Sequence, residues 1–390
     1  MKKVLIIAHV ISHIKAFHIP YIEWFKSKGY EVHVLTNAQG AELPCCDKLY
    51  DLDIERYPFS LKNLKAIKEA KKIIDAEGYE LIHCHPPMGG VIGRLSSIKA
   101  RKNGTKVLYT AHGFHFYKGA PIINWLLYYT VEKILSFFTD CIITINEEDY
   151  RKASKSFATK KTAVEKISGV GVDISKFSPL TKEEKQNLKK EYGYDGKLLL
   201  IYAAEFSKDK NHSFSVDSLE ELKKYIPNIK ILFCGMGKFF EETKSYAFQK
   251  NKSDYIDFLG YRDDMSNLYG ISDVLITSSV REGLATNVIE GMATGLPAVA
   301  TDIRGHRDVV ENGKIGYLFK VDDTEEFVNA VKKLIDSEER YNAFSENAII
   351  RAKDFNLENS IKQTEAIYKK YGIEGECGEP AVGINSNTCL

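Results

Sequence analysis

Hydrophobic and polar positions alternate in a regular way in the N-terminal half of the chain. Apolar runs predict buried strands at 2–8 and 31–36, and the segment from 19 to 28 has a helical spacing of apolar residues, ended by Gly29. Further strands are predicted at 81–85, 107–110 and 141–144, and further helices at 61–77, 91–102 and 122–138. Strands that alternate with helices in this way predict a parallel sheet.

The same alternation restarts after residue 180. Strands are predicted at 198–203, 230–234, 257–259, 274–277 and 298–300, and the helices among them include 213–224 and 239–250. Because 390 residues are too many for one ordinary hydrophobic core, this restart indicates two domains. We therefore predict an α/β protein of two doubly wound domains, which meet at a linker near residues 170–180 and leave a cleft between their strand ends.

Composition and charge narrow the possible functions. Apolar residues make up 44% of the chain, enough for two cores, and a formal net charge of +1 excludes a general attraction for nucleic acid. Residues 1–170 hold 25 Lys and Arg against 17 Asp and Glu, or +8, whereas the remainder holds 29 against 36, or −7. The positive excess therefore belongs to the N-terminal domain.

The cysteines and the apolar stretches indicate a cytoplasmic protein. Seven cysteines without a repeating spacing do not form a disulfide framework, and no secretory leader precedes the first strand. The longest apolar stretch, 122–138, contains Glu132 and Lys133 and is too short and interrupted for a membrane span. We expect a reduced, cytosolic setting.

Two carboxylates eight positions apart are the most informative chemical feature of the chain. Glu282 and Glu290 flank a predicted helix start, with Asn287 as the expected N-cap and the Gly-Leu-Pro segment 295–297 as the expected stop. Glu282 then lies on the loop before the helix and Glu290 in its first turn. Free amide groups of residues 285–288 and the positive end of the helix dipole favour a phosphate there. A phosphate flanked by two acceptor side chains suits a nucleotide sugar.

Glu290 also has a purely structural interpretation, because Asn287-x-x-Glu290 has the spacing of a capping box. The flanking segments favour a ligand role, since 274–279 is predicted as a buried strand and 298–301 as another. The acidic pair then stands at the carboxyl end of a strand, where open α/β sheets bind ligands.

An ordered set of motifs extends over nearly the whole C-terminal half. It comprises the linker 171–179, Lys210 within 207–212, the turn Gly235-Met236-Gly237, the Gly-Tyr-Arg-Asp-Asp segment 260–264, and Glu282-x7-Glu290 followed by Gly295-Leu296-Pro297. With this set the chain resembles the retaining glycosyltransferases of family 4, which have the two-domain GT-B fold. The segment 109–116, Tyr-Thr-Ala-His-Gly-Phe-His-Phe, is similar to bacterial capsule and exopolysaccharide members.

The resemblance implies a domain organisation. A Rossmann-like domain over 1–172 serves the acceptor, a second over 180–357 binds the nucleotide sugar, and a helix at 358–372 crosses back onto the first domain. The Gly-rich and polar stretch 373–390 is expected to form a flexible tail.

The resemblance also implies roles for individual residues. Glu290 would bond the ribose hydroxyls, Glu282 the sugar hydroxyls, and Lys210 would neutralise the diphosphate. The family usually has an arginine five residues before this lysine, but here Glu205 occupies that position, so one expected positive contact is missing. His112, just past a predicted strand, would touch the transferred sugar through a neutral imidazole. The predicted catalytic residues are therefore His112, Glu282 and Lys210.

Further donor contacts are expected from loops and turns. The complete donor-binding set is Glu290, Gly283, Leu284, Ala285, Thr286, Asn287, Tyr261, Arg262, Gly235, Ser12, His13 and Glu205. Tyr261 and Arg262 lie on a turn that either contacts the base or is a plain strand-end turn. Ser12 and His13 lie on the first loop, where family members often carry a Gly-Gly pair close to the phosphates.

No metal and no other cofactor is predicted. Asp51-Leu52-Asp53 has the form of a metal-binding pair, but it lies in a polar stretch outside the motif region and is interpreted as a solvated loop. His83-Cys84-His85 and His112-x-x-His115 suggest zinc, but strand alternation puts Cys84 opposite its neighbours and no matching pair follows. Lys210 and backbone groups are expected to neutralise the diphosphate.

The acceptor side offers a possible membrane contact. Lysines recur at helical spacing over 61–77, at Lys62, Lys65, Lys68, Lys71 and Lys72, and the predicted helix 122–138 carries Trp125, Tyr128 and Tyr129. A basic face beside an aromatic helix can lie on the anionic inner face of a cell membrane, although a solvated face plus a core helix gives the same pattern.

The sequence therefore predicts a metal-independent, retaining glycosyltransferase. It would move a hexose or N-acetylhexosamine from a UDP-sugar to a lipid-linked or glycan acceptor in bacterial surface polysaccharide assembly. Two alternatives stay open: a nucleotide-sugar epimerase of the same architecture, which needs no acceptor, and a non-catalytic protein that binds a nucleotide sugar and leaves it intact.

Overall fold

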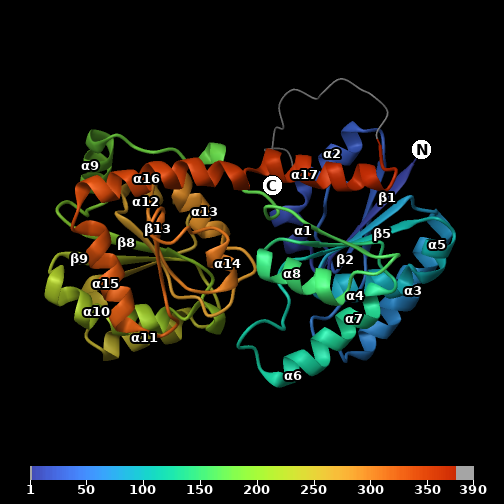
Figure 1. Cartoon of the computed structure of the whole chain (residues 1–390), viewed down its shortest axis with the longest axis horizontal. Helices are drawn as coiled ribbons and strands as arrows, with labels where there is room; N and C mark the ends of the chain where they lie inside the picture. Colours follow the sequence, from blue (N-terminus) through green and yellow to red (C-terminus); the bar gives the residue numbers. More distant parts are fainter. Residues whose placement is uncertain (1, 375–390) are drawn as a thin grey trace. The chain divides into compact units, whose positions relative to one another are not determined.

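The computed structural model describes residues 2–374 and divides the chain into two compact units. Unit 1 comprises Met1–Gly171 with Ser360–Leu390, and unit 2 comprises Val172–Asn359. Figure 1 follows the chain through both units by colour. Of the expected tail 373–390, residues 375–390 lie outside the described part of the chain.

Unit 1 is built on a parallel sheet of seven strands in the order β3-β2-β1-β4-β5-β6-β7. The strands are β1 (Lys3–Ile7), β2 (Glu31–Thr36), β3 (Lys48–Asp51), β4 (Leu81–Cys84), β5 (Lys106–Ala111), β6 (Cys141–Thr144) and β7 (Ala163–Lys166). The strand order reverses between β1 and β4. Open α/β sheets bind ligands at such a switch point, beyond the carboxyl ends of the strands.

The helices of unit 1 connect successive strands. They are α1 (Ile11–Phe17), α2 (Ile19–Ser27), α3 (Leu61–Glu77), α4 (Met88–Ser96), α5 (Ile98–Lys102), α6 (Ile122–Asn124), α7 (Thr130–Ser136) and α8 (Glu147–Ser156). A five-residue π-helical segment, η1 (Trp125–Tyr129), joins α6 to α7. From Ser360 onward, α17 (Leu357–Lys370) packs on unit 1, where the hydroxyl of Tyr368 lies 2.7 Å from Nδ1 of His83. The expected return of the last helix to the first domain is confirmed.

Unit 2 has a parallel sheet of six strands in the order β10-β9-β8-β11-β12-β13. The strands are β8 (Leu198–Ala203), β9 (Ile229–Cys234), β10 (Ile256–Gly260), β11 (Val274–Thr277), β12 (Ala298–Thr301) and β13 (Gly316–Phe319). The switch point of this sheet lies between β8 and β11.

The helices of unit 2 again alternate with the strands. They are α9 (Lys182–Glu191), α10 (His212–Tyr225), α11 (Phe240–Gln249), α12 (Met265–Ile271), α13 (Thr286–Ala293), α14 (Arg304–Arg307), α15 (Thr324–Ile335) and α16 (Glu338–Ala352). Short 3-10 turns stand at η2 (Ile174–Lys176), η3 (Lys208–Lys210), η4 (Ser253–Tyr255) and η5 (Lys353–Phe355).

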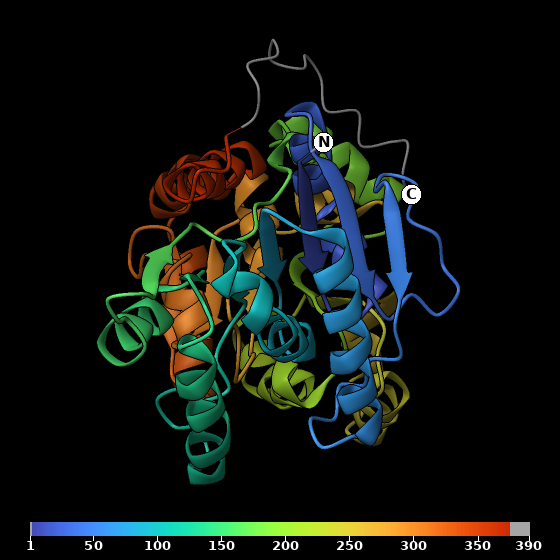
Figure 2. The ribbon, with the colours of Figure 1, turned by 90° about the vertical axis from the view of Figure 1, so that its right-hand side faces the viewer.

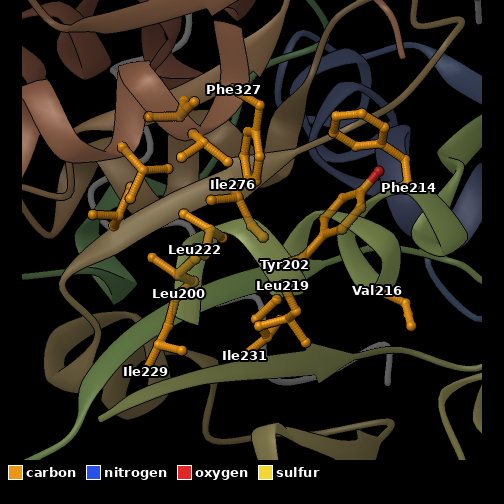
Figure 3. Packing of buried hydrophobic residues seen from close by; sticks show 14 of the residues in the cluster. Leu200, Tyr202, Phe214, Val216, Leu219, Leu222, Ile229, Ile231, Ile276 and Phe327 are labelled. Atoms are coloured by element: carbon orange, nitrogen blue, oxygen red, sulfur yellow. The ribbon is translucent and has the colours of Figure 1, made fainter. Parts of the chain in front are cut away.

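Alternate residues of β8 pack into separate cores on the two faces of the unit 2 sheet. Leu200 and Tyr202 join one buried cluster with Phe214 of α10, and this packing is shown in Figure 3. Leu199 and Ile201 belong to a second buried cluster. Because both faces are covered, the strand is a continuous apolar run, as expected for a central strand of a parallel sheet.

The predicted parallel α/β sheets are confirmed, but the sequence pattern does not predict β3, β7 or β13. Each of these strands stands at an edge of its sheet. The side chains of β3 and β7 are exposed or half-buried, and the two middle residues of β13 are half-buried. An edge strand needs no apolar run, so these strands gave no such signal.

Candidate functional site

Glu282 and Lys210 meet at the carboxyl edge of the unit 2 sheet. Glu282 stands on the loop between β11 and α13, and Lys210 ends η3, the turn that follows β8. The Glu282 carboxylate forms an ion pair with Nζ of Lys210, and the two side chains are only 15% and 21% exposed. Because β8 and β11 are neighbours in the sheet, two distant segments deliver opposite charges to one place.

The ammonium of Lys210 is poorly solvated. Burial lowers the pKa of this side chain to about 8, and the nearby carboxylates of Glu205 and Asp209 act in the opposite direction. The backbone is fixed as well, because the Lys210 carbonyl accepts a hydrogen bond of 2.6 Å from the hydroxyl of Tyr202. A poorly solvated cation held in this way is stabilised electrostatically when a second anion enters the site.

Arg281 is a second cation beside Lys210, and the sequence analysis assigned it no role. Its guanidinium pairs with the carboxylate of Asp209, with Nε at 3.1 Å and Nη2 at 2.5 Å. The charge of Arg281 also lowers the pKa of Lys210, which places the two cations within electrostatic range of each other. The position of Arg281 directly before Glu282 was the only signal in the sequence.

The predicted cap of α13 is wrong. The helix begins at Thr286 with Ala285 as the N-cap, and the side chain of Asn287 donates 2.8 Å to the carbonyl of Ala203. The side-chain amide of Asn287 therefore bonds a neighbouring strand and does not cap the helix. Glu290 is the fifth helical residue, beyond the first turn, so the capping-box interpretation is also wrong.

The structure corrects the expected set of free amides at residues 285–288. The N–H of Val288, which was predicted to be free, donates to the carbonyl of Ala285 at 3.2 Å. Ala285 supplies no side-chain cap to the first turn. A helix start that lacks a side-chain cap favours an anion through its amide groups and its dipole.

Glu290 is a half-buried residue of α13 whose carboxyl group is poorly solvated. The hydroxyl of Tyr269 donates to it at 3.1 Å. Burial raises the pKa of Glu290 from an ordinary value near 4.5 to about 7, and the Tyr269 bond only partly opposes this effect. The group is therefore poised to accept further hydrogen bonds, which would stabilise its ionised form.

The other predicted donor residues of unit 2 lie on neighbouring loops. Tyr261 is 79% exposed after β10, and Arg262 is engaged by the carboxylate of Asp264 through Nε at 2.7 Å and Nη2 at 2.5 Å. Gly235 has φ +136°, and a Cβ there would collide with the carbonyl oxygen of Ala204. Gly235 is thus required by close backbone packing, whatever ligand the loop meets. Gly283 and Leu284 are half-buried on the loop that carries Glu282, and Glu205 is exposed.

The predicted residues of unit 1 include two histidines that meet near its switch point. His112 follows β5, and His13 lies in α1, the helix that follows β1. Their ring centroids are 4.8 Å apart. Burial and the charge that His13 would carry lower the pKa of His112 well below its usual value, so its imidazole is neutral near pH 7. Ser12 is exposed on α1.

The histidines that suggested zinc in the sequence are arranged as strand alternation predicts. His83 and His85 lie on one face, with ring centroids 4.3 Å apart, whereas Cys84 packs against Gly93 of α4 on the other. His115 stacks on Tyr128, with centroids 4.7 Å apart. Asp51 and Asp53 are exposed, as expected. Asp51 accepts a hydrogen bond of 2.7 Å from the amide of Ala38, and it ends strand β3 rather than lying in a loop.

The expected basic face of α3 is partly neutralised by the protein itself. Nζ of Lys62 lies 3.1 Å from the carboxylate of Asp53, and Nζ of Lys71 lies 2.6 Å from that of Asp75. Lys65 is 3.7 Å from Glu69. The lysine spacing therefore overstates the free positive charge of this helix.

The helical stretch from Ile122 to Ser136 turns its aromatic residues inward. Trp125, Tyr128 and Tyr129 pack against the buried core of unit 1. The exposed residues are aliphatic instead, with Ile122 78% exposed and Leu126 66% exposed. Within residues 2–374, no helix combines the length and the apolar character needed to cross a membrane.

Comparisons with known proteins match almost the whole chain. The family model "Glycosyl transferases group 1" matches residues 183–351, and "Glycosyl transferase 4-like" matches residues 4–146. The chain is 42% identical over 371 residues to the "Putative glycosyltransferase EpsD" of Bacillus subtilis (strain 168), covering 95% of this chain and 97% of that protein.

A more distant relative and two solved structures extend the comparison. The chain is 25% identical to the "UDP-Gal:alpha-D-GlcNAc-diphosphoundecaprenol alpha-1,3-galactosyltransferase" of Escherichia coli, covering 94% of this chain and 96% of that protein. Sucrose-phosphate synthase from Thermosynechococcus elongatus has a TM-score of 0.76, with 18% identity over 95% of this chain and 99% of the other. Anabaena HepE in complex with UDP-glucose has a TM-score of 0.74, with 18% identity over 95% and 100%. At such identities the structures establish a shared fold.

Proposed function

The chain belongs to the family 4 glycosyltransferases, and on this premise we propose that it transfers a hexose or N-acetylhexosamine from a UDP-sugar to a lipid-linked or glycan acceptor. The relatives support a role in bacterial surface polysaccharide assembly, because one of them is named for a diphosphoundecaprenol-linked acceptor and another as a capsular polysaccharide enzyme. The complex of HepE with UDP-glucose supports the donor class. We propose retention of anomeric configuration on the family resemblance alone.

The observation that carries the donor proposal is the Lys210–Glu282 ion pair, which joins η3 to the loop before α13. A diphosphate that enters this loop competes with Glu282 for the ammonium. Exchange of partners gives Lys210 a more highly charged anion and releases the Glu282 carboxylate to accept hydrogen bonds from sugar hydroxyls. One rearrangement thus prepares both the leaving group and the sugar.

We propose that protein groups neutralise the diphosphate without a metal ion. Lys210 and Arg281 supply two positive charges, and the helix start of α13 supplies amide groups and a favourable dipole. Charge that grows on the leaving UDP is stabilised by fixed donors of this kind without solvent reorganisation. Arg281 would take the part of the arginine that Glu205 replaces.

Glu290 and His112 complete the proposed roles. The half-buried carboxylate of Glu290 would accept hydrogen bonds from the ribose hydroxyls, which favour its ionised form. His112 would donate from its neutral imidazole to a hydroxyl of the transferred sugar. The attack would occur on the face of the leaving group, with a phosphate oxygen accepting the proton of the acceptor hydroxyl.

Donor binding is tested by comparing two lysines of the same 3-10 turn. Lys210→Ala should weaken UDP binding by about tenfold to a hundredfold, because a charge-assisted contact is lost. Lys208 is exposed on η3 and lies outside the ion pair, so Lys208→Ala should bind UDP like the wild type. Calorimetry with UDP decides the question, and unchanged binding by Lys210→Ala would contradict the proposed site.

Transfer itself is tested with radiolabelled UDP-sugars and bacterial membrane extracts. The expected result is label in a lipid-linked product for one donor, and loss of that product in Glu282→Ala. Conversion of the donor to an isomer without any acceptor would establish the epimerase instead. A donor that is bound and recovered intact with every extract would establish the non-catalytic alternative.

We further propose a peripheral contact between unit 1 and an anionic membrane surface. The exposed apolar residues of the helical stretch and of its C-cap recur at helical spacing, and we call them the apolar stripe: Ile122, Ile123, Leu126, Ile134 and Phe137. A second exposed apolar group surrounds the start of α3, with Tyr57, Phe59, Leu61 and Leu64. Both α3 and α6 follow strands of a parallel sheet and begin beyond its carboxyl edge, and Figure 2 shows both helical segments reaching the lower end of the view.

The exposed apolar side chains and the positive charge of unit 1 favour contact with an anionic lipid surface. These two groups together hold nine large apolar side chains that are more than half exposed, and clustered exposed apolar side chains are typical of interaction sites. Residues 1–170 also carry 25 positive against 17 negative charges, an excess of +8 that favours an anionic surface. A lipid-linked acceptor would be presented at such a surface.

A further inference from the structure

Three histidines from separate parts of unit 1 converge beyond the carboxyl edge of its sheet. His13 lies in α1, His18 stands at the junction of α1 and α2, and His112 follows β5. One ring nitrogen from each can be chosen so that all three atoms lie within 4.8 Å of one another. Nε2 of His18 is 3.1 Å from Nδ1 of His13.

This spacing is close to that of ligands around one metal ion. Zinc binds imidazole nitrogen at about 2.0–2.1 Å in tetrahedral geometry, which puts two such nitrogens about 3.3 Å apart. The His13–His18 distance already matches. The widest separation must close by about 1.5 Å, which rotation of the half-buried rings of His13 and His112 would supply.

Neighbouring polar groups hold the histidines in place. Nδ1 of His85 lies 3.3 Å from Nε2 of His112, and the ring of His85 lies 3.8 Å from that of His18 between centroids. The next histidine, His83, is itself fixed by the hydroxyls of Thr110 and Tyr368, at 2.8 and 2.7 Å. Such an outer layer orients the ligands of metal sites.

We propose that His13, His18 and His112 form a binding site for Zn²⁺ or a similar imidazole-preferring ion. The donor set is all nitrogen, which favours zinc, cobalt, nickel or copper over the oxygen-preferring magnesium and calcium. Three protein ligands leave a fourth position for water or an anion. The site lies in unit 1 and shares His112 with the proposed sugar contact, so a bound ion and a hydroxyl of the transferred sugar would compete for this imidazole.

Cobalt serves as the spectroscopic probe and zinc as the competitor. The full chain is stripped of metal with a chelator and titrated with Co²⁺. The expected result is a visible absorption band of a four- or five-coordinate ion that saturates at one cobalt per chain and disappears when Zn²⁺ is added. Mg²⁺ should not displace the cobalt.

Variants decide whether the three histidines are the ligands. His13→Ala should weaken cobalt binding by about tenfold or more. His115→Ala is the matched control, because His115 also follows β5 but stacks on Tyr128 outside the trio, and it should bind cobalt like the wild type. His13 is half-buried, so this variant should fold, and its melting temperature checks this.

Three results would overturn the proposal. They are a wild-type chain that gives no band at saturating cobalt, equal affinity of His13→Ala and wild type, and a thiolate-to-cobalt charge-transfer band, which would assign the ion to cysteine. None of these readouts depends on enzymatic activity, so failure of the metal site is distinguishable from failure of the proposed transfer reaction.

Discussion

Glu290 shows how burial alone makes a side chain sensitive to pH. Its folded-state pKa is about 7, against an ordinary value near 4.5. As pH rises past 4.5 the unfolded chain loses this proton, while the folded chain keeps it until about pH 7. The native state therefore loses stability across that window, and the loss is complete above pH 7.

Glu290→Gln removes this titration and should stabilise the unliganded protein at alkaline pH. The expected gain over the wild type is up to about 3 kcal/mol at pH 8 and is largely absent at pH 5, as measured by urea unfolding. Glu346 is exposed on α16, so Glu346→Gln should show no such difference between the two pH values. A stability gain for Glu290→Gln that is equal at pH 5 and pH 8 would contradict the raised pKa of this carboxyl group.

Arg281→Gln tests whether Arg281 supplies the second positive charge to the diphosphate. UDP binding should weaken by about 1–3 kcal/mol, while uridine, which lacks phosphate, should bind as it does to the wild type. Arg307 of α14 forms an ion pair with Asp302. Arg307→Gln removes this similar ion pair and therefore serves as the control. Calorimetry with both ligands decides, and an equal loss for UDP and uridine would show that Arg281 acts on the fold instead.

At the scale of elements, the β11–loop–α13 segment shows what the sequence can and cannot predict. The buried strand, the loop and the helix were predicted because each has its own local pattern. The cap was predicted wrongly, because the side chain of Asn287 donates to the Ala203 carbonyl of β8. No local sequence pattern contains that contact. The Arg281–Asp209 pair was missed for the same reason.

The helical stretch from Ile122 to Ser136 shows the same limit in another form. Its sequence predicts a helix that combines aliphatic and aromatic residues, but the face turned outward depends on what the helix packs against. The core of unit 1 takes Trp125, Tyr128 and Tyr129, and this leaves the aliphatic stripe exposed. The side of this stretch that is proposed to meet a membrane is therefore mainly aliphatic.

The double change Ile122→Glu and Leu126→Glu should abolish membrane binding through this stripe. In a flotation assay at low salt, the wild type should rise with phosphatidylglycerol vesicles and the variant should stay at the bottom. Each buried aliphatic side chain contributes about 1.5–3 kcal/mol to such binding. Phe248 is 73% exposed on α11 of unit 2, so Phe248→Glu serves as a control that should still float. A double variant that floats like the wild type would contradict the proposed surface.

At the scale of the whole molecule, the chain divides its charge between two units of the same architecture. Unit 1 holds 28 Lys and Arg against 21 Asp and Glu, or +7, and unit 2 holds 26 against 32, or −6, although the two sheets follow the same doubly wound plan. The unit with the negative balance is the one proposed to hold the diphosphate. Its affinity must therefore come from local placement of Lys210, Arg281 and the start of α13 rather than from net charge.

Because these local groups carry the positive charge, UDP binding by the whole chain should not require a divalent ion. Calorimetry in excess EDTA should give the same UDP affinity as in its absence, and Mn²⁺ should not restore binding to Lys210→Ala. EDTA would also remove an ion from the three histidines of unit 1, but UDP lacks the transferred sugar that His112 is proposed to contact, so this loss should leave UDP binding unchanged. Loss of UDP binding in EDTA, reversed by Mn²⁺, would show that an ion rather than Lys210 and Arg281 neutralises the diphosphate.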